Sequence, residues 1–314
     1  MVLFNALLFF ASLFVVVRSA EYCTRYATQL AKMLHLSEFT VSFFIVALIS
    51  TFPEASISIF SAINGVPELG LGTLLGSNIA DLTLVFGIVA LMSQKGVHVK
   101  SEILKKDFLY LVLLLFPIIL GWDGFFSRMD GLLLVLGGVF FFFSLSIESR
   151  MFRKKWNNLR NFPAVKNMFF LALSMAALMI SAEFTVKYGT DFAYDLRMPA
   201  ALVGLTIISI GTCLPELIFS VKAVKNKHDS LALGDILGTV ITDATIVLGV
   251  VAIINPFYFK PALIYLTGFA MFLAGLLAVV FISSEKTLTK KEGVYLLFFY
   301  ICYLVAEFVM NKVM

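Results

Sequence analysis

Charged side chains are scarce in this chain of 314 residues. Asp, Glu, Lys and Arg together make up 14% of the sequence, whereas soluble domains average about 25%. Hydrophobic residues reach 60%, and 33 of the residues are Phe. This composition excludes an ordinary soluble domain and predicts a protein that lies in a lipid bilayer.

Cysteine and histidine are equally rare, with three of each. The cysteines, Cys23, Cys213 and Cys302, lie in or beside apolar segments, so we expect no disulfide framework. The histidines are far apart, which leaves no Cys/His spacing typical of a metal site. The basic residues fall in short separate clusters rather than in one stripe, so a nucleic-acid partner is not expected.

The most prominent feature of the sequence is its long apolar runs. Because about 20 apolar residues span a bilayer, the pattern predicts an all-α polytopic membrane protein with ten transmembrane helices. The segments are roughly 2–19, 36–62, 69–93, 106–122, 130–148, 167–186, 199–223, 231–256, 259–282 and 292–311. The start of the chain lacks a basic region and a cleavage site before Arg18, so we interpret it as a retained first span.

The basic residues predict the orientation in the cell membrane. With the N-terminus outside, the alternate loops that face the cytoplasm hold 19 of the 24 Lys and Arg residues. Such a bias is the positive-inside signal of cytoplasmic loops. We therefore expect both termini on the extracytoplasmic side.

The sequence repeats itself at an offset of 162 residues. This offset takes Pro53 to Pro215 and Glu54 to Glu216, and it takes the Gly76–Asp81 stretch to Gly238–Asp243. We predict a first repeat over 1–148 with its motif at 47–81, a basic cytoplasmic linker over 149–166, and a second repeat over 167–314 with its motif at 209–243. Five spans per repeat is an odd number, so the repeats are inverted. Inverted repeats with interrupted central helices are typical of alternating-access transporters.

Four carboxylates lie inside the repeated apolar runs: Glu54, Asp81, Glu216 and Asp243. Each costs about 2.5–3.5 kcal/mol at the centre of a bilayer on insertion scales. The central thirds of these spans contain no Lys or Arg. A bound cation or a proton must therefore balance the charge.

Each carboxylate has a hydroxyl one helical turn before it, on the same helix face. The hydroxyls are those of Ser50, Ser77, Thr212 and Thr239. Pro53 and Pro215 break their helices and free carbonyls one turn back, near Ala47 to Ser50 and Ser209 to Thr212. Carboxylate, hydroxyl and carbonyl oxygens are the ligands that hard cations such as Ca²⁺ take. Glycines at four-residue spacing, Gly72, Gly76, Gly234 and Gly238, let helices approach closely.

At these motifs the sequence resembles the α-repeats of the sodium/calcium exchanger family. The family pattern is Gly-Thr-Ser-Leu-Pro-Glu followed by Gly-Asn-x-x-Gly-Ser-Asn-Ile-x-Asn/Asp, and Gly211–Glu216 and Gly76–Asp81 match it closely. The resemblance implies a transporter, not an enzyme, that exchanges Ca²⁺ for Na⁺ by alternating access and needs no cofactor besides the transported ions. It implies that Glu54 and Glu216 are central ligands. It also implies hydroxyl ligands at Ser50, Thr51, Ser77, Thr212 and Thr239, and backbone carbonyl ligands at Ala47 and Ser209.

Several positions depart from the family pattern. Cys213 replaces a serine ligand, and a neutral thiol is a poor partner for a hard cation. Thr73 and Asp235 stand at the two usual Asn positions, and Asp81 is acidic where Asn is common. We expect Asp81 and Asp243 to form a second acidic pair that handles protons or water-mediated Na⁺ contacts. The excess of carboxylates over the charge of one Ca²⁺ keeps H⁺-coupled and K⁺-dependent exchange open as alternatives.

Two other functional classes, a cation channel and an intramembrane protease, fit the sequence less well. A cation channel does not need two inverted, proline-broken halves around an acidic centre. An intramembrane aspartyl protease, suggested by Gly234-Asp235, needs a second catalytic Asp with its own motif, and the repeat explains the acids better. The expected partners are the lipid bilayer and inorganic cations, and the sequence leaves the counter-ion and the oligomeric state open.

Overall fold

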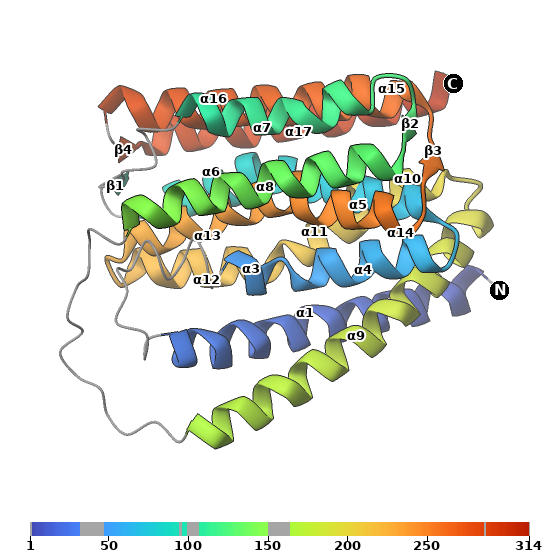
Figure 1. Cartoon of the computed structure of the whole chain (residues 1–314), viewed down its shortest axis with the longest axis horizontal. Coiled ribbons are helices and arrows are strands. Elements are labelled where there is room, and N and C mark those ends of the chain that lie inside the picture. Colours follow the sequence, from blue (N-terminus) through green and yellow to red (C-terminus); the bar gives the residue numbers. More distant parts are fainter. Residues whose placement is uncertain are drawn as a thin grey trace.

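The computed structural model describes residues 2–31, 47–93, 96–98, 107–149, 164–285 and 287–313. Within them the helices run roughly along one common axis and form a bundle (Figure 1). The first part of the predicted second span and most of the predicted linker lie outside the described residues.

The first half contains eight helical segments and two short strands in its described part. They are α1 (Val2–Ala31), α3 (Ala47–Ser50), α4 (Phe52–Ile63), α5 (Pro67–Ala80), the π-helical η3 (Asp81–Val85), α6 (Phe86–Met92), β1 (Val97–His98), α7 (Asp107–Leu120), β2 (Phe125–Phe126) and α8 (Arg128–Ser149).

The second half repeats this order. Its elements are α9 (Ala164–Asp195), α10 (Ala200–Val203), η5 (Gly204–Ile208), α11 (Ser209–Thr212), α12 (Leu214–Lys225), α13 (Asp229–Ile241), η6 (Thr242–Val247), α14 (Leu248–Ile254), β3 (Phe257–Tyr258), α15 (Pro261–Leu263), η7 (Ile264–Gly268), α16 (Phe269–Glu285), β4 (Thr287–Leu288) and α17 (Lys290–Val313).

The offset found in the sequence also relates the helix bounds. Adding 162 to the bounds of α4 gives those of α12, and the same step takes the bounds of α6 to those of α14. The equivalent helices α1 and α9 run in opposite directions along the bundle, and the two chain ends lie at the same end of it (Figure 1). The predicted inverted arrangement agrees with these directions.

Seven helices in the described part of the chain are long and apolar enough to cross a membrane. They correspond to the first, third and sixth to tenth predicted spans. The shorter apolar helices Phe52–Ile63 and Leu109–Leu120 fall within the second and fourth predicted spans, and α8 covers the fifth. An all-helical membrane fold is therefore confirmed, and the number of ten spans stays a prediction.

Two antiparallel strand pairs, not predicted from the sequence, connect the halves. At one end of the bundle β1 pairs with β4, placing Val97 opposite Leu288, and at the other end β2 pairs with β3, placing Phe125 opposite Tyr258 (Figure 1). Each pair takes one strand from each repeat. The backbone pairing therefore interlocks the two halves at both ends.

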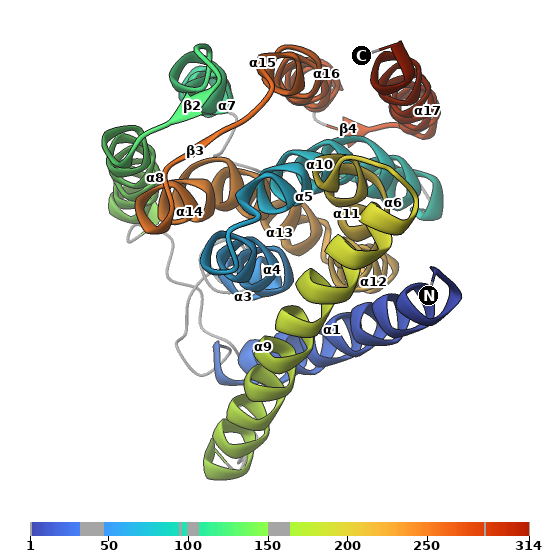
Figure 2. The same cartoon turned by 90° about the vertical axis from the view of Figure 1, so that its right-hand side faces the viewer.

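The helices form three layers (Figure 2). The middle layer contains α5, α6, α13 and α14, and 83% of the residues in the most apolar 18-residue windows of the corresponding spans, Pro67–Met92 and Asp229–Ile254, are buried. On one side lie α7, α16 and α17, and on the other α1 and α9 cross each other. In the most apolar 18-residue windows of Leu3–Cys23 and Lys166–Asp195 only 33% of the residues are buried, and in Lys290–Met310 only 28% are. The first, sixth and tenth spans therefore lie at the periphery of the bundle.

Glycines bring the helix backbones of the two halves together. A Cβ on Gly76 would lie 2.5 Å from the carbonyl oxygen of Leu205. Gly131 and Gly249 face each other across α8 and α14, and their repeat equivalents Gly293 and Gly87 do the same across α17 and α6. Close packing of small residues is the usual way for membrane helices to associate.

We expect Gly76→Ala to lower the free energy of unfolding by about 1–3 kcal/mol, because the added Cβ would strike backbone that cannot rotate away. Thermal unfolding in detergent measures this loss. Gly189→Ala in α9 is the control, since its Cβ would meet only the edge of the Phe9 ring at 3.1 Å. Equal melting temperatures for the two variants would show that the close approach at Gly76 is not needed.

Candidate cation site at the broken helices

The predicted helix breaks are present in both halves. The first break separates α3 from α4 at Thr51, with Pro53 in the first turn of α4, and the second separates α11 from α12 at Cys213, with Pro215 in the first turn of α12. Proline has no backbone N–H and cannot complete the hydrogen bond to the preceding turn. Glu54 and Glu216 consequently lie in the first turn of a new helix, where the helix dipole favours negative charge.

The central carboxylates are fully buried and lack hydrogen-bond partners. Glu54 and Glu216 have no exposed surface, and no donor lies in good hydrogen-bond geometry with any of their carboxylate oxygens, although the Thr212 hydroxyl is close enough to Glu54 to stabilise its charge. Asp81 likewise has no exposed surface and no donor in good hydrogen-bond geometry. Buried polar atoms are normally paired, so orphaned carboxylate oxygens need an explanation such as an ion or water.

The second pair of acids lies where the helices change pitch. Asp81 is the first residue of η3, and Asp243 is the second residue of η6. Single π-helical turns inside α-helices often occur at functional sites. Asp243 is also fully buried and has one oxygen without a partner.

Side chains from the two repeats meet at this centre. The Ser50 hydroxyl donates to Oδ1 of Asp235 at 2.8 Å and lies 3.0 Å from the Thr239 hydroxyl. The Ser77 hydroxyl donates to Oδ2 of Asp243 at 3.4 Å. All these groups are fully buried. The candidate site therefore lies at the interface between the halves and not within either one.

The remaining predicted ligands lie in the same helix breaks. The Thr51 hydroxyl donates to the carbonyl of Ala47 at 2.6 Å, and the Thr212 hydroxyl donates to the carbonyl of Ser209 at 3.2 Å. Both carbonyls thus already accept hydrogen bonds from their own turn. Their role as ligands stays a prediction.

Cys213 occupies the position in the second repeat that Thr51 occupies in the first, and it is almost completely buried. Its thiol approaches the backbone carbonyl of Ser77 at 3.5 Å. The thiol therefore makes a contact between the repeats that the hydroxyl of Thr51 does not make. The predicted weakening of one Na⁺ subsite by this cysteine stays a prediction.

The charged groups at the site are carboxylates, all of the same sign. The structure shows an ion pair of Arg18 with Glu21, at 2.9 Å, and it lies outside this centre. The carboxylates repel one another: Glu54 acts electrostatically on each of Asp81, Glu216, Asp235 and Asp243. In the described part of the chain no three His, Cys, Asp or Glu side chains converge closely enough to hold a metal ion by themselves.

Asp235 was not among the predicted ligands, although the structure places it in the cluster. The sequence carried a signal, since Asp235 is a fifth acid in an apolar run and departs from the family pattern. Tyr110 and Tyr300 are also buried near Asp81, and their hydroxyls lack hydrogen-bond partners. A tyrosine in an apolar segment predicts only packing, so a role of these hydroxyls could not be predicted from the sequence.

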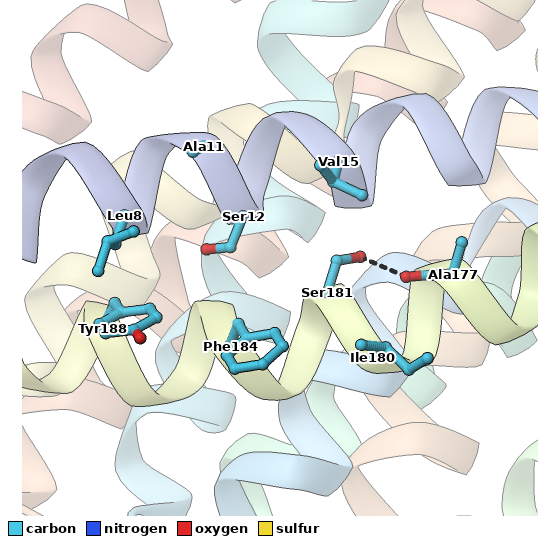
Figure 3. Close-up of a pocket in the computed structure, with 9 residues that line it drawn as sticks. All are labelled: Leu8, Ala11, Ser12, Val15, Ala177, Ile180, Ser181, Phe184 and Tyr188. Carbon is cyan, nitrogen blue, oxygen red and sulfur yellow. Dashed lines mark hydrogen bonds between the residues drawn. The ribbon is translucent and has the colours of Figure 1, made fainter.

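A groove of about 480 Å³ lies elsewhere, between α1 and α9 (Figure 3). Its lining is Leu8, Ala11, Ser12, Val15, Ala177, Ile180, Ser181, Phe184 and Tyr188. None of these residues is acidic, and α1 and α9 contribute none of the predicted ligands. The groove is therefore not the cation site.

Comparison with known proteins identifies the family. The profile of a family described as "Sodium/calcium exchanger protein" matches residues 4–146 and 166–309, nearly the whole of both repeats. The chain belongs to the sodium/calcium exchanger family. The resemblance inferred from the two motifs is thus confirmed, and the chain is a member of a family of membrane antiporters.

Relatives of this exchanger-family chain cover nearly its full length. It is 28% identical to the sodium/calcium exchanger MaX1 of Methanosarcina acetivorans, over 98% of this chain and 99% of that protein. It is 32% identical to the putative antiporter CaxA of Alkalimonas amylolytica, over 93% and 94% of the two chains. Solved structures of the sodium-calcium exchanger NCX_Mj superpose with a TM-score of 0.71 at 22% identity, over 97% of this chain and 99% of that chain. The last likeness shows a shared fold.

The contacts of Ser50 predict a stability effect. Ser50→Ala removes the donor to Asp235, and leaving a buried acceptor unsatisfied costs about 1–3 kcal/mol. We therefore expect thermal unfolding of Ser50→Ala to begin at a clearly lower temperature. Ser61→Ala is the matched control, because the Ser61 hydroxyl bonds only to the carbonyl of Ile57 in its own helix, at 2.8 Å. A Ser50 variant as stable as the Ser61 variant would contradict the prediction.

Proposed function

We propose that this exchanger-family protein moves Ca²⁺ out of or into the cell in exchange for Na⁺, by alternating access. The observation that carries the proposal is the pair of buried carboxylates without partners, Glu54 and Glu216, in broken helices from opposite repeats. Two negative charges match one Ca²⁺, and the same oxygens can hold Na⁺ when Ca²⁺ is absent. The name of the relative MaX1 supports this choice of ions.

The ligands proposed around these two carboxylates are neutral oxygens. They are the hydroxyls of Ser50, Thr51, Ser77, Thr212 and Thr239 and the carbonyls of Ala47 and Ser209, with Asp81 and Asp243 as a flanking acidic pair. Ca²⁺ takes six to eight oxygens at about 2.3–2.6 Å. A mixed set fits this requirement, since no three acidic, histidine or cysteine side chains of the described residues converge on one point. The transported ions are the only bound species proposed.

Coupling to H⁺ is the second candidate. The observation that favours it is the number of carboxylates, because Asp81, Asp235 and Asp243 join the central pair in one buried cluster. Five carboxylates exceed the charge of one Ca²⁺ ion. Proteoliposomes with imposed Na⁺, K⁺ or H⁺ gradients, each tested alone for ⁴⁵Ca²⁺ uptake, separate the candidates. Uptake driven by the H⁺ gradient and not by the Na⁺ gradient would replace the proposed counter-ion.

Glu54→Gln and Glu216→Gln should each abolish Ca²⁺ exchange while the protein still folds, because the amide keeps the volume but removes one of the two charges. ⁴⁵Ca²⁺ uptake and thermal unfolding of the same preparations measure both properties. Glu68→Gln is the control, since Glu68 is an exposed acid in the first turn of α5. Near-normal exchange by either central variant would refute the assignment.

We further propose that α1 and α9 slide across a fixed core. The support is the contrast in burial between the apolar 18-residue windows of these helices, 33%, and those of the core spans, 83% in the third and eighth and 61% in the seventh. The groove of Figure 3 lies between α1 and α9, which otherwise pack against each other along their length. The core helices carry the proposed ligands, and the glycine contacts and strand pairs hold them together. Binding of a cation neutralises the repelling carboxylates and so permits occlusion.

Single cysteines at Asn5 and Glu21, near the two ends of the apolar part of α1, test the sliding motion in a variant without the native cysteines. Their labelling rates should change in opposite senses when Ca²⁺ or Na⁺ is added, because sliding exposes one end as it covers the other. A cysteine at Asn64, between the core helices α4 and α5, is the comparison. A larger response at Asn64 than at either α1 position would reject the sliding mechanism.

A further inference from the structure

One face of α17 carries tyrosine side chains into the interior of the bundle. Tyr300 and Tyr303 are buried, whereas Ile301 between them is exposed. Tyr303 lies beside Thr267 and Glu307. The hydroxyl of Tyr300 has no hydrogen-bond partner in the structure. Because buried hydroxyls are normally paired, the groups around Tyr300 indicate what its hydroxyl can bind.

The repeat shows which element Tyr300 faces. Its equivalent in α8 is Gly138, where an added Cβ would strike the hydroxyl of Thr245 in η6. The same offset places Tyr300 beside Thr83 in η3, and α17 does pack against η3. The first residue of η3 is Asp81. The second half therefore directs a tyrosine toward an acid from a position where the first half has no room for a side chain.

Asp81 is the carboxylate near this hydroxyl. It acts electrostatically on Tyr300, as does Cys213 from the second repeat. Both carboxylate oxygens of Asp81 are fully buried, and no donor lies in good hydrogen-bond geometry with them. The thiol of Cys213 is close to Asp81, but a thiol is only a weak donor. A carboxylate that needs donors therefore lies near a hydroxyl that needs an acceptor.

A second tyrosine approaches Asp81 from α7. Apart from its first residue, α7 has one polar side chain, that of Tyr110. Tyr110 is 1% exposed, its hydroxyl has no hydrogen-bond partner, and Asp81 acts on it electrostatically. Its repeat equivalent is Phe272, which has no hydroxyl. Asp243 thus lacks the equivalents of both tyrosines and accepts instead from Ser77, at 3.4 Å.

We propose that Tyr300 and Tyr110 are positioning residues that hold the carboxylate of Asp81 by hydrogen bonds, so that it faces the cation centre in one orientation. The inference rests on the proposed function for the ions involved. Phenol hydroxyls suit this role, because they donate to a carboxylate that has several acceptor positions. A side chain that is already ordered loses less conformational entropy when a ligand binds. The tyrosines therefore raise the affinity for a cation without touching it.

The tyrosines connect the outer layer of the bundle with the candidate site. They belong to α7 and α17, which lie on one side of the middle layer and contribute none of the proposed ligands (Figure 2). Asp243 is held differently, since its donor Ser77 lies in the middle-layer helix α5. The two flanking acids, equivalent by the repeat, therefore depend on different parts of the fold for their orientation.

A double-mutant cycle on the purified full-length protein tests the assignment by calorimetry with CaCl₂ and with NaCl. Tyr300→Phe should weaken Ca²⁺ binding about fivefold, and Na⁺ binding less, because the doubly charged ion interacts more strongly with a well-placed carboxylate. In an Asp81→Asn background the same change should alter Ca²⁺ binding by less than about twofold, because the group that it positions has lost its charge. In an Asp243→Asn background the full loss should persist.

Two further tyrosine variants complete the experiment. Tyr110→Phe should show the same dependence on Asp81, and it keeps the assignment testable if Tyr300→Phe folds poorly. Tyr303→Phe is the matched control, because it removes a buried hydroxyl one turn along the same helix and should leave Ca²⁺ binding unchanged.

Three results would overturn the assignment: equal losses in the Asp81→Asn and Asp243→Asn backgrounds, unchanged Ca²⁺ binding in both Tyr300→Phe and Tyr110→Phe, or a lower melting temperature with ion binding unchanged. A wild-type protein that binds neither ion would overturn it together with the proposed function. A wild-type protein that binds both ions but does not exchange them would refute the proposed function and leave the cycle to decide the role of the tyrosines.

Discussion

The structure depends on burying several carboxylates without a basic side chain to pair with them. Glu54, Asp81 and Glu216 have no exposed surface and no hydrogen-bond partner for their oxygens. Isolated buried charge is among the most costly features in a protein, and in a membrane it marks an ion pathway. The broken helices, the converging hydroxyls and the contacts between repeats all place oxygen atoms around that charge. A cation in the centre would turn the most destabilising part of the fold into a stabilising one.

A rigid frame is needed to keep repelling groups together. The frame is built from contacts that occur twice, related by the repeat: the strand pairs β1–β4 and β2–β3, and the glycine contacts of Gly131 with Gly249 and of Gly87 with Gly293. Each contact joins one half to the other. Neither repeat can therefore relax away from the acidic centre without breaking contacts at both ends of the bundle. The helices α1 and α9 take no part in the strand pairs or in these glycine contacts, and they pack on the frame through a buried cluster in which Phe9 and Val186 meet Ile57.

Most of what could be predicted about the structure came from the 162-residue offset between the repeats. It related the helix bounds of the two halves, and the prolines located the breaks before Glu54 and Glu216. The sequence could not predict which hydroxyl meets which acid across the repeats. The contact of Ser50 with Asp235 joins residues 185 positions apart and depends on how helices of different repeats pack against each other. The strand pairs were missed for the same reason, since two residues give no detectable alternation and the partners are distant in sequence.

Departures from the repeat matter because of what perfect symmetry would imply. If both halves had the same sequence, inversion would make the inward-open and outward-open states identical in energy, with the same ion affinity from either side. Differences between equivalent positions are the only means by which such a fold can distinguish its two faces. Thr73 against Asp235 and Thr51 against Cys213 are differences of this kind. They lie at the proposed ligands or next to them, so we expect them to change ion affinity as well as the packing between the repeats.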